Sequence, residues 1–208
     1  RYLFICCPQH FLQDYAKTNY PNKLIEMPTN KYFLYQLEKL DIGSEICLND
    51  NIIKLIKNSK YTFDYSEINL TFYPENCKEK VFILLPPVVE WGKTNIVSDK
   101  KIDIFFCGRK NEQRDSICQS LKLEGYNVLQ VTDKVGNDLT NIIQKSRIFL
   151  NLHHDNSGSL ETCRLNEAVM SSDVHIISEK SSQQELEEIY GDRVNFIDRI
   201  NKKNYVEL

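Results

Sequence analysis

Apolar runs that alternate with helix-like segments are the feature that most constrains this chain. The second half has five such runs, each short enough for one buried strand, and most are separated by segments with helical spacing. They span residues 102–107, 126–131, 147–152, 174–178 and 194–197. Strands that alternate with helices form parallel sheets with right-handed crossovers. The pattern therefore predicts an α/β fold with a parallel sheet flanked by helices.

The stretch from residue 146 to residue 179 contains the densest set of candidate functional side chains. It reads as a strand (147–152), the polar loop HHDNSGS, a helix with apolar positions from residue 160, and another strand. Ser159 is placed to cap that helix. Two histidines, an arginine and two glutamates thus gather where a strand ends and a helix begins. Ligands of parallel sheets bind at such carboxyl ends, and helix N-termini there attract anions.

The first half is less regular, and it predicts a second, smaller domain. Strands are expected at residues 2–7, 60–65 and 80–89, with helices at 9–20 and 51–57. The run KYFLYQLEKL, residues 31–40, fits a strand or a helix. Its aromatic residues Tyr32, Phe33 and Tyr35 suit a core better than a sugar-binding platform. Two prolines at 86 and 87 and the polar run that follows mark a connection, so we expect domains at residues 1–87 and 88–208.

Composition excludes several classes of protein. The formal charge is -3 and the sequence pI is about 5.9, so no global basic field favours nucleic acid. No apolar run approaches the length of a membrane span, and no secretory signal is present, so we expect a cytoplasmic protein without an integral membrane segment. The seven cysteines form no C-x-x-C pair and are interpreted as buried, reduced thiols.

A basic segment follows the strand at residues 102–107. Gly108 lets a ligand approach the backbone closely, and Arg109, Lys110 and Arg114 can neutralise phosphate. The same three cations also fit an ordinary, solvated start of a helix. That helix is expected at residues 114–123, with Ile117, Leu121 and Leu123 as candidate buried positions and Gly125 at its end. Phosphate contact is thus one of two readings of this segment.

The helix after the polar loop carries Glu161, Arg164 and Glu167. They can bind a ligand, or they can form surface salt bridges, because residues three apart on a helix are neighbours. In the loop itself, His153 and His154 can be solvated, contact a phosphate or sugar, or, with the aspartate that follows, hold a metal. A lone HHD sequence is weak evidence for metal, and we expect no metal site.

Several of these segments resemble the GT-B glycosyltransferases. IDIFFCGRKNEQR and KSRIFLNLHHDNSGSLETCRLNEAVMSSDVHIISE resemble their donor-binding half, and the block LE-x-x-R-L-x-EA is the most specific part. KYFLYQLEKL, SKYTFDYSEIN and VFILLPP resemble the end of the N-terminal domain and its hinge. The resemblance covers about residues 31 to 198. It implies two Rossmann-like domains of the GT-B type, with parallel sheets flanked by helices.

The resemblance also implies an activity. It predicts a glycosyltransferase that moves a sugar from a nucleotide-sugar to a hydroxyl of a glycan, protein or lipid, with retention, without a metal and without a cofactor. Glu167 matches the residue that holds the ribose, and Glu161 lies near the one that contacts the donor sugar. The implied catalytic residues are His153 and Glu161. The implied donor-binding residues are Gly108, Arg109, Lys110, Arg114, His154, Ser159, Leu160, Arg164 and Glu167.

Two other classes of protein remain as alternatives. One is a non-catalytic module that binds a nucleotide or a glycan. The other is a Rossmann-like enzyme with a nicotinamide cofactor, which is disfavoured because no G-x-G-x-x-G follows any strand.

Overall fold

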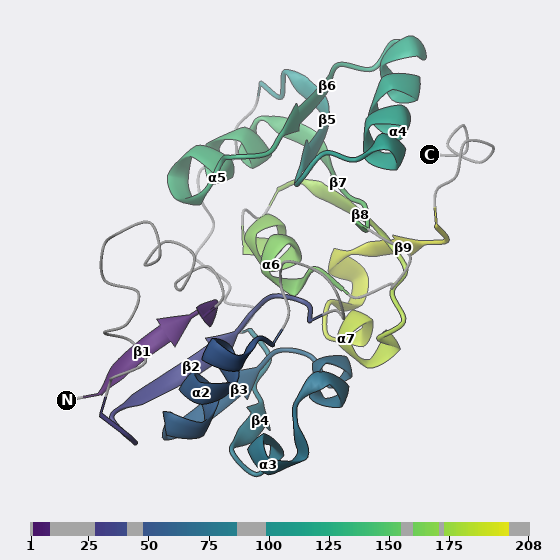
Figure 1. Ribbon diagram of the computed structural model, residues 1–208. Helices are drawn as coiled ribbons and strands as arrows, with labels where there is room; N and C mark the ends of the chain where they lie inside the picture. Colours follow the sequence, from purple (N-terminus) through teal and green to yellow (C-terminus); the bar gives the residue numbers. More distant parts are fainter. Residues whose placement is uncertain are drawn as a thin grey trace. The chain divides into compact units, whose positions relative to one another are not determined.

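The chain divides into two compact units, Arg1–Pro86 (unit 1) and Pro87–Leu208 (unit 2). The computed structural model describes residues 2–8, 28–40, 48–86, 99–154, 160–170 and 173–199 (Figure 1). Both units are α/β, and every strand pairing in them is parallel. In these described ranges, no helix has the length and apolar character needed to span a membrane.

The sheet of unit 1 has its strands in the order in which they occur along the chain. They are β1 (Leu3–Cys6), β2 (Tyr32–Gln36), β3 (Tyr61–Asp64) and β4 (Val81–Ile83), arranged β1-β2-β3-β4. The run KYFLYQLEKL is therefore a strand at its start. Alternation explains this choice, because Tyr32 and Leu34 are fully buried on one face while Phe33 between them lies on the other.

The helical elements of unit 1 pack on one face of that sheet. They are α2 (Asp50–Asn58), the 3₁₀ segment η1 (Ile68–Phe72) and α3 (Glu75–Lys78). Helix α2 starts where the Asn49 side chain accepts hydrogen bonds from two backbone amides of the first turn. Its apolar side, together with Cys77 of α3, packs against Tyr32 and Leu34. The core of unit 1 thus lies on a single side of the sheet.

Asp64, at the end of β3, organises the segment that leads to α3. Its carboxylate is fully buried and accepts hydrogen bonds from the Ser66 amide at 2.9 Å, from Asn69 Nδ2 at 2.9 Å and from the Tyr73 hydroxyl at 2.7 Å. Asn69 in turn accepts from the Leu40 amide at 2.9 Å. One buried carboxylate therefore fixes the 3₁₀ segment against the ends of β2 and β3.

Unit 2 has a five-stranded sheet in the order β6-β5-β7-β8-β9. Its strands are β5 (Ile102–Cys107), β6 (Val128–Val131), β7 (Ser146–Asn151), β8 (His175–Glu179) and β9 (Asn195–Ile197). All five lie close to the apolar runs, so the parallel α/β sheet expected from the sequence is confirmed. The central strands are buried because they consist of isoleucine, leucine and phenylalanine.

Helices cover both faces of the sheet of unit 2. They are α4 (Glu112–Leu123), α5 (Gly136–Gln144), α6 (Thr162–Met170) and α7 (Gln184–Glu188), with a 3₁₀ turn η2 (Gly191–Arg193). Figure 1 shows α4 on one side of the sheet and α5 with α6 on the other. Ile117 and Leu121 of α4 are buried as expected. Leu123 was also expected to be buried but is 78% exposed, because it is the last residue of α4 and Gly125 then turns the chain away with a φ of +96°.

Several expectations for local structure lie outside the described residues. These are the helix before residue 21, the polar connection after Pro87 and the helix cap at Ser159. The thiols are only partly as expected. Cys77, Cys107 and Cys118 are buried and free, whereas Cys6 and Cys163 are exposed.

The buried carboxyl of Asp64 should make unit 1 less stable as the pH rises. Burial raises the pKa of Asp64 to about 6, well above that of an unfolded aspartate, so the folded unit binds the proton more tightly. Its stabilising effect is complete below pH ~4 and is lost as the pH rises through about 6. Urea denaturation at a series of pH values, followed by the NMR signals of β2 and β3, measures how the free energy of unfolding of unit 1 depends on pH.

Asp64→Asn removes the titrating carboxyl and so isolates its contribution to the pH dependence of the stability of unit 1. The stability of this variant relative to wild type should rise over the same interval, by at most about 3 kcal/mol. Glu67→Gln is the matched control, since Glu67 is an exposed carboxyl in the same unit. Parallel stability profiles for Asp64→Asn and wild type would show that Asp64 is not the group responsible.

Candidate functional site

The candidate site lies at the carboxyl ends of β5, β7 and β8. In the strand order β6-β5-β7-β8-β9, the chain leaves β5 toward one side of the sheet and β7 toward the other. The loops that follow β5 and β7 therefore diverge. A hydrogen bond from Asn111 Nδ2 to the His154 carbonyl oxygen, at 2.6 Å, joins them. We call this part of unit 2 the carboxyl edge.

His153 and Glu161 form the centre of the carboxyl edge. His153 Nδ1 lies 2.9 Å from Glu161 Oε2, and its Nε2 lies 2.9 Å from the backbone oxygen of Lys180. The His153 backbone amide donates to Glu179 Oε2 at 2.7 Å. Asn151 Nδ2 donates to Glu161 Oε2 at 3.2 Å. These bonds join the end of β7, the start of α6 and the end of β8.

The hydrogen bonds of His153 indicate a doubly protonated ring. A backbone oxygen can only accept, so Nε2 carries a proton, and Nδ1 faces a carboxylate that also accepts. Burial alone lowers the pKa of His153, but the hydrogen bond to Glu161, the charges of Glu161 and Glu179 and the bond to Lys180 outweigh it and raise the pKa. The imidazole is thus a buried cation held between three strand and helix ends.

Arg114 is the second buried cation of the carboxyl edge. Only 1% of its surface is exposed. It donates through Nη1 to the Arg109 carbonyl oxygen at 2.8 Å and through Nη2 to the Leu152 carbonyl oxygen. Its Nη2 lies 3.6 Å from Glu161 Oε1, and its guanidinium lies over the Phe106 ring at 5.2 Å. Arg114 therefore holds the two diverging loops together, and its burial contradicts the picture of a solvated helix start.

Arg164 is the third cation, and it reaches back from α6 to the end of β5. Its Nη1 donates to Asn151 Oδ1 at 2.8 Å and lies 3.9 Å from Glu161 Oε1. A Cβ built on Gly108 would lie 3.1 Å from Arg164 Nη2 and 3.1 Å from the Phe106 ring. A side chain at this position would require the guanidinium or the ring to shift by a few tenths of an ångström.

Glu161 is the shared partner of all three cations. Burial raises its pKa, but the hydrogen bond from His153, the charges of Arg164 and His153 and the hydrogen bond from Asn151 together lower the pKa below the usual value. The carboxylate is therefore ionised at neutral pH. We call His153, Glu161, Arg114, Arg164 and Glu179 the buried ionic cluster.

The remaining residues expected at the site occupy different environments. Arg109, Lys110 and His154 are exposed at the carboxyl edge. Glu167 accepts a hydrogen bond from the Thr140 hydroxyl of α5 at 3.0 Å. The backbone amide of Leu160, whose side chain is fully buried, donates to the Gln183 side chain. Ser159 lies outside the described residues.

Two residues of the site were missed in the sequence. Asn151 and Glu179 are both fully buried and stand at the carboxyl ends of β7 and β8. Each is a polar residue at the end of an apolar strand run, and this position in a parallel sheet is the signal that identifies them.

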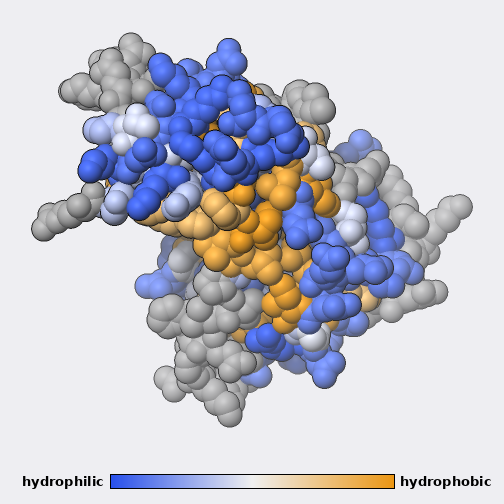
Figure 2. Space-filling model, turned by 90° about the horizontal axis from the view of Figure 1, so that it is seen from below, coloured by the Kyte–Doolittle hydropathy of each residue, from blue (hydrophilic) through white to orange (hydrophobic). Residues whose placement is uncertain are grey.

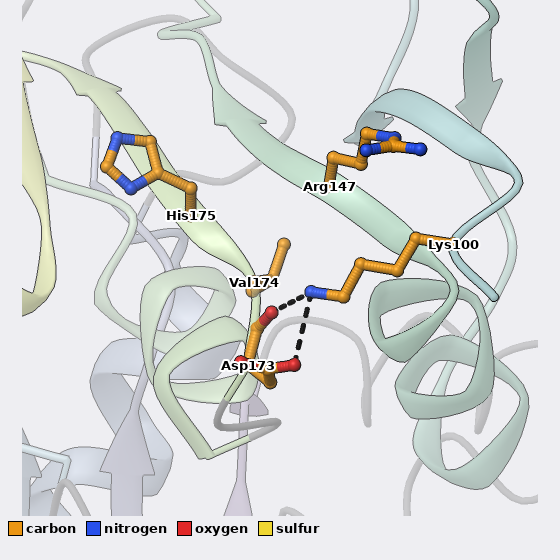
Figure 3. Close-up of a pocket in the computed structure, with 5 residues that line it drawn as sticks. All are labelled: Lys100, Arg147, Asp173, Val174 and His175. Carbon is orange, nitrogen blue, oxygen red and sulfur yellow. Dashed lines mark hydrogen bonds and ion pairs between the residues drawn. The ribbon is translucent and has the colours of Figure 1, made fainter. Parts of the chain in front are cut away.

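A hollow lies at the opposite, amino end of the same sheet. Figure 3 shows its lining residues Lys100, Arg147, Asp173, Val174 and His175. Lys100 Nζ bonds the Asp173 backbone oxygen and lies 3.5 Å from its carboxylate, so its charge is already balanced. Ligands of parallel sheets bind at the other end. In the described part of the chain, no three His, Cys, Asp or Glu side chains are grouped to hold a metal ion.

This chain shows little similarity to known proteins. No protein-family model matches the chain, and no curated protein matches it. Among solved structures, it is similar to the solution structure of the E. coli RcsC C-terminus, which contains a linker region and a phosphoreceiver domain. The identity is 8% and the TM-score 0.37, over 100% of this chain and 89% of that one. Such a distant likeness gives no information about what this chain binds.

These comparisons contradict the family and the activity inferred from the sequence. No glycosyltransferase family matches, and the structure found is that of a phosphoreceiver-containing chain. The GT-B assignment, the enzymatic sugar transfer and the retaining, metal-independent chemistry that it implied are therefore wrong. The LE-x-x-R-L-x-EA block suggested the wrong family because its charged residues have partners within the fold. Glu161 and Arg164 pair with each other and with neighbouring residues of the fold, which is the salt-bridge alternative for this helix.

The buried His153 cation should make unit 2 lose stability as the pH rises. Because the pKa of His153 is raised in the folded state, its stabilising effect is complete below the unfolded value of about 6.5 and is lost above it. His153→Gln should therefore cost most stability near pH 6 and less near pH 9, by about 1.4 kcal/mol for each unit of pKa shift.

Urea denaturation of both proteins across that range gives the measurement. His154→Gln is the control, since His154 is the exposed neighbour, and its effect on stability should be small at every pH. A constant difference between His153→Gln and wild type would mean that the imidazole is not charged in the folded unit.

Proposed function

We propose that unit 2 binds a small molecule that carries a phosphate or diphosphate group at its carboxyl edge. The observation that supports this most directly is the convergence of three cationic side chains, Arg114, His153 and Arg164, at this edge. Positive charge concentrated at the carboxyl end of a parallel sheet favours an anionic ligand.

The backbone of the first loop supports the same ligand class. Arg109 and Lys110, which follow Gly108, are exposed at the carboxyl edge. Helix α4 then begins at Glu112 with Asn111 as its N-cap, and a helix N-terminus favours anions.

The roles of the individual residues follow from their burial. Arg114 and His153 are nearly inaccessible, so they set the positive potential and hold the loops. Arg164 is 20% exposed and, with Arg109 and Lys110, is placed to contact the ligand. His154 lies at the same edge. A nucleotide-sugar, the partner expected from the sequence, belongs to this ligand class, as do free nucleotides.

Pyrophosphate and ADP should bind the full chain at the carboxyl edge. An NMR titration of ¹⁵N-labelled protein should shift the amides of residues 108–111 and 151–154, and glucose should leave them unchanged. Arg109→Ser with Lys110→Ser should weaken binding by about tenfold, because each exposed charge contributes up to about 1 kcal/mol. Added salt should weaken wild-type binding.

Lys101→Ser is the matched control, since Lys101 is an exposed cation of the same unit at the other end of β5. It should bind both ligands as wild type does. If millimolar pyrophosphate and ADP shift no amide at the carboxyl edge, or shift the residues of Figure 3 instead, the proposed function is wrong.

A further inference from the structure

The sheet of unit 1 has a second face that no described helix covers. Right-handed crossovers between strands in the order β1-β2-β3-β4 all advance in one direction, so the described helices of unit 1 fall on the same side. The core contacts agree, because α2 and α3 pack against Tyr32 and Leu34 on that side. Parallel sheets are otherwise covered on both faces. We call the other side the outer face.

The outer face consists almost entirely of aromatic rings. Its described positions are Tyr2, Phe4, Cys6, Phe33, Tyr35, Tyr61, Phe63, Phe82 and Leu84. Phe4, Phe33 and Phe63, on three adjacent strands, have ring centroids 6.2–6.5 Å apart. Tyr61 and Phe82 continue the row at 5.3 Å. The rings thus form one continuous surface across all four strands.

These rings are accessible to an extent that is unusual for a parallel sheet. Phe4 is 51% exposed, Phe82 46% and Tyr2 56%. Figure 2 shows hydrophobic residues gathered in a continuous patch. Contiguous apolar patches of this kind mark interaction sites, whereas single exposed apolar residues do not. Phe33, which was expected in the core, is half-buried and lies in this row, whereas Tyr35 on the same face is buried.

Lysines line the amino end of the outer face. Lys31 and Lys60 immediately precede β2 and β3, whereas Lys80 Nζ donates to the Lys57 and Ser59 carbonyl oxygens at the end of α2. Lys60 Nζ lies 4.8 Å from the centre of the Tyr2 ring and 5.9 Å from that of Phe33. None of the nine described outer-face positions carries an acidic side chain. The surface is therefore apolar with a basic border.

We propose that the outer face docks an amphipathic helix of a partner protein, with apolar residues toward the rings and acidic residues toward the lysines. A helix is the element that covers a parallel sheet, and an apolar stripe on it complements the aromatic row. The lysines select an acidic partner. A second copy of this chain is a poor match, because its outer face offers no carboxylate to them. The formal charge of -3 disfavours a nucleic acid as the partner.

A display library of helices tests the proposal without knowledge of the natural partner. Each helix of ~18 residues carries a fixed leucine stripe, and its other positions vary among glutamate, lysine and glutamine. Selection on the full chain should enrich glutamate. Phe4→Ser and Phe82→Ser should each weaken binding of a selected peptide about tenfold, the effect of removing a buried aromatic side chain. Lys60→Glu should shift the selection toward lysine.

Leu123→Ser is the control, since Leu123 is an exposed apolar residue of unit 2, and it should bind the peptides as wild type does. Selection without enrichment of glutamate, or equal binding by Phe4→Ser and Phe82→Ser, overturns the proposal. So does a dimer that Phe82→Ser dissociates, since the occupant would then be a second copy. Binding of single-stranded oligonucleotides or anionic vesicles in place of peptides overturns it as well.

Discussion

The contact between Glu161 and His153 is the interaction on which the carboxyl edge of unit 2 depends. It joins the first turn of α6 to the end of β7, and through the Lys180 carbonyl and Glu179 to the end of β8. A buried carboxylate is costly unless it is fully paired. Here the imidazolium, two guanidinium groups and an amide surround it. At the carboxyl edge, three cationic side chains therefore converge on Glu161 in a fixed arrangement.

The same cluster explains why a sequence motif suggested the wrong family. Glu161 and Arg164 are three apart on one helix, and such a pair is expected wherever a helix must neutralise its own charges. In this chain the pair completes the buried ionic cluster. The spacing in LE-x-x-R-L-x-EA is thus accounted for by contacts within the fold, and it does not require a sugar donor. The feature that still indicates a ligand is the positive charge of Arg109, Lys110 and Arg164 beside Gly108.

Much of the architecture could be predicted because the strands of unit 2 are short apolar runs. IDIFFC and RIFLNL are apolar enough to predict central strands. Gly125 predicts the end of a helix, and it has a positive φ. Other features depend on tertiary contacts that no local pattern carries. Arg114 looked like an exposed residue at a helix start, but the backbone oxygens of two loops bury it. The outer face of unit 1 follows from strand order, which the sequence does not display.

A double-mutant cycle between His153 and Glu161 tests the central claim most directly. The free energy of unfolding of unit 2 is measured at neutral pH for wild type, His153→Gln, Glu161→Gln and the double variant. A buried, charge-assisted contact predicts a coupling energy of about 1–3 kcal/mol, with the double variant less destabilised than the sum of the single ones. Effects that add within about 0.5 kcal/mol would contradict the account, because Glu161 and His153 would then contribute independently to the fold.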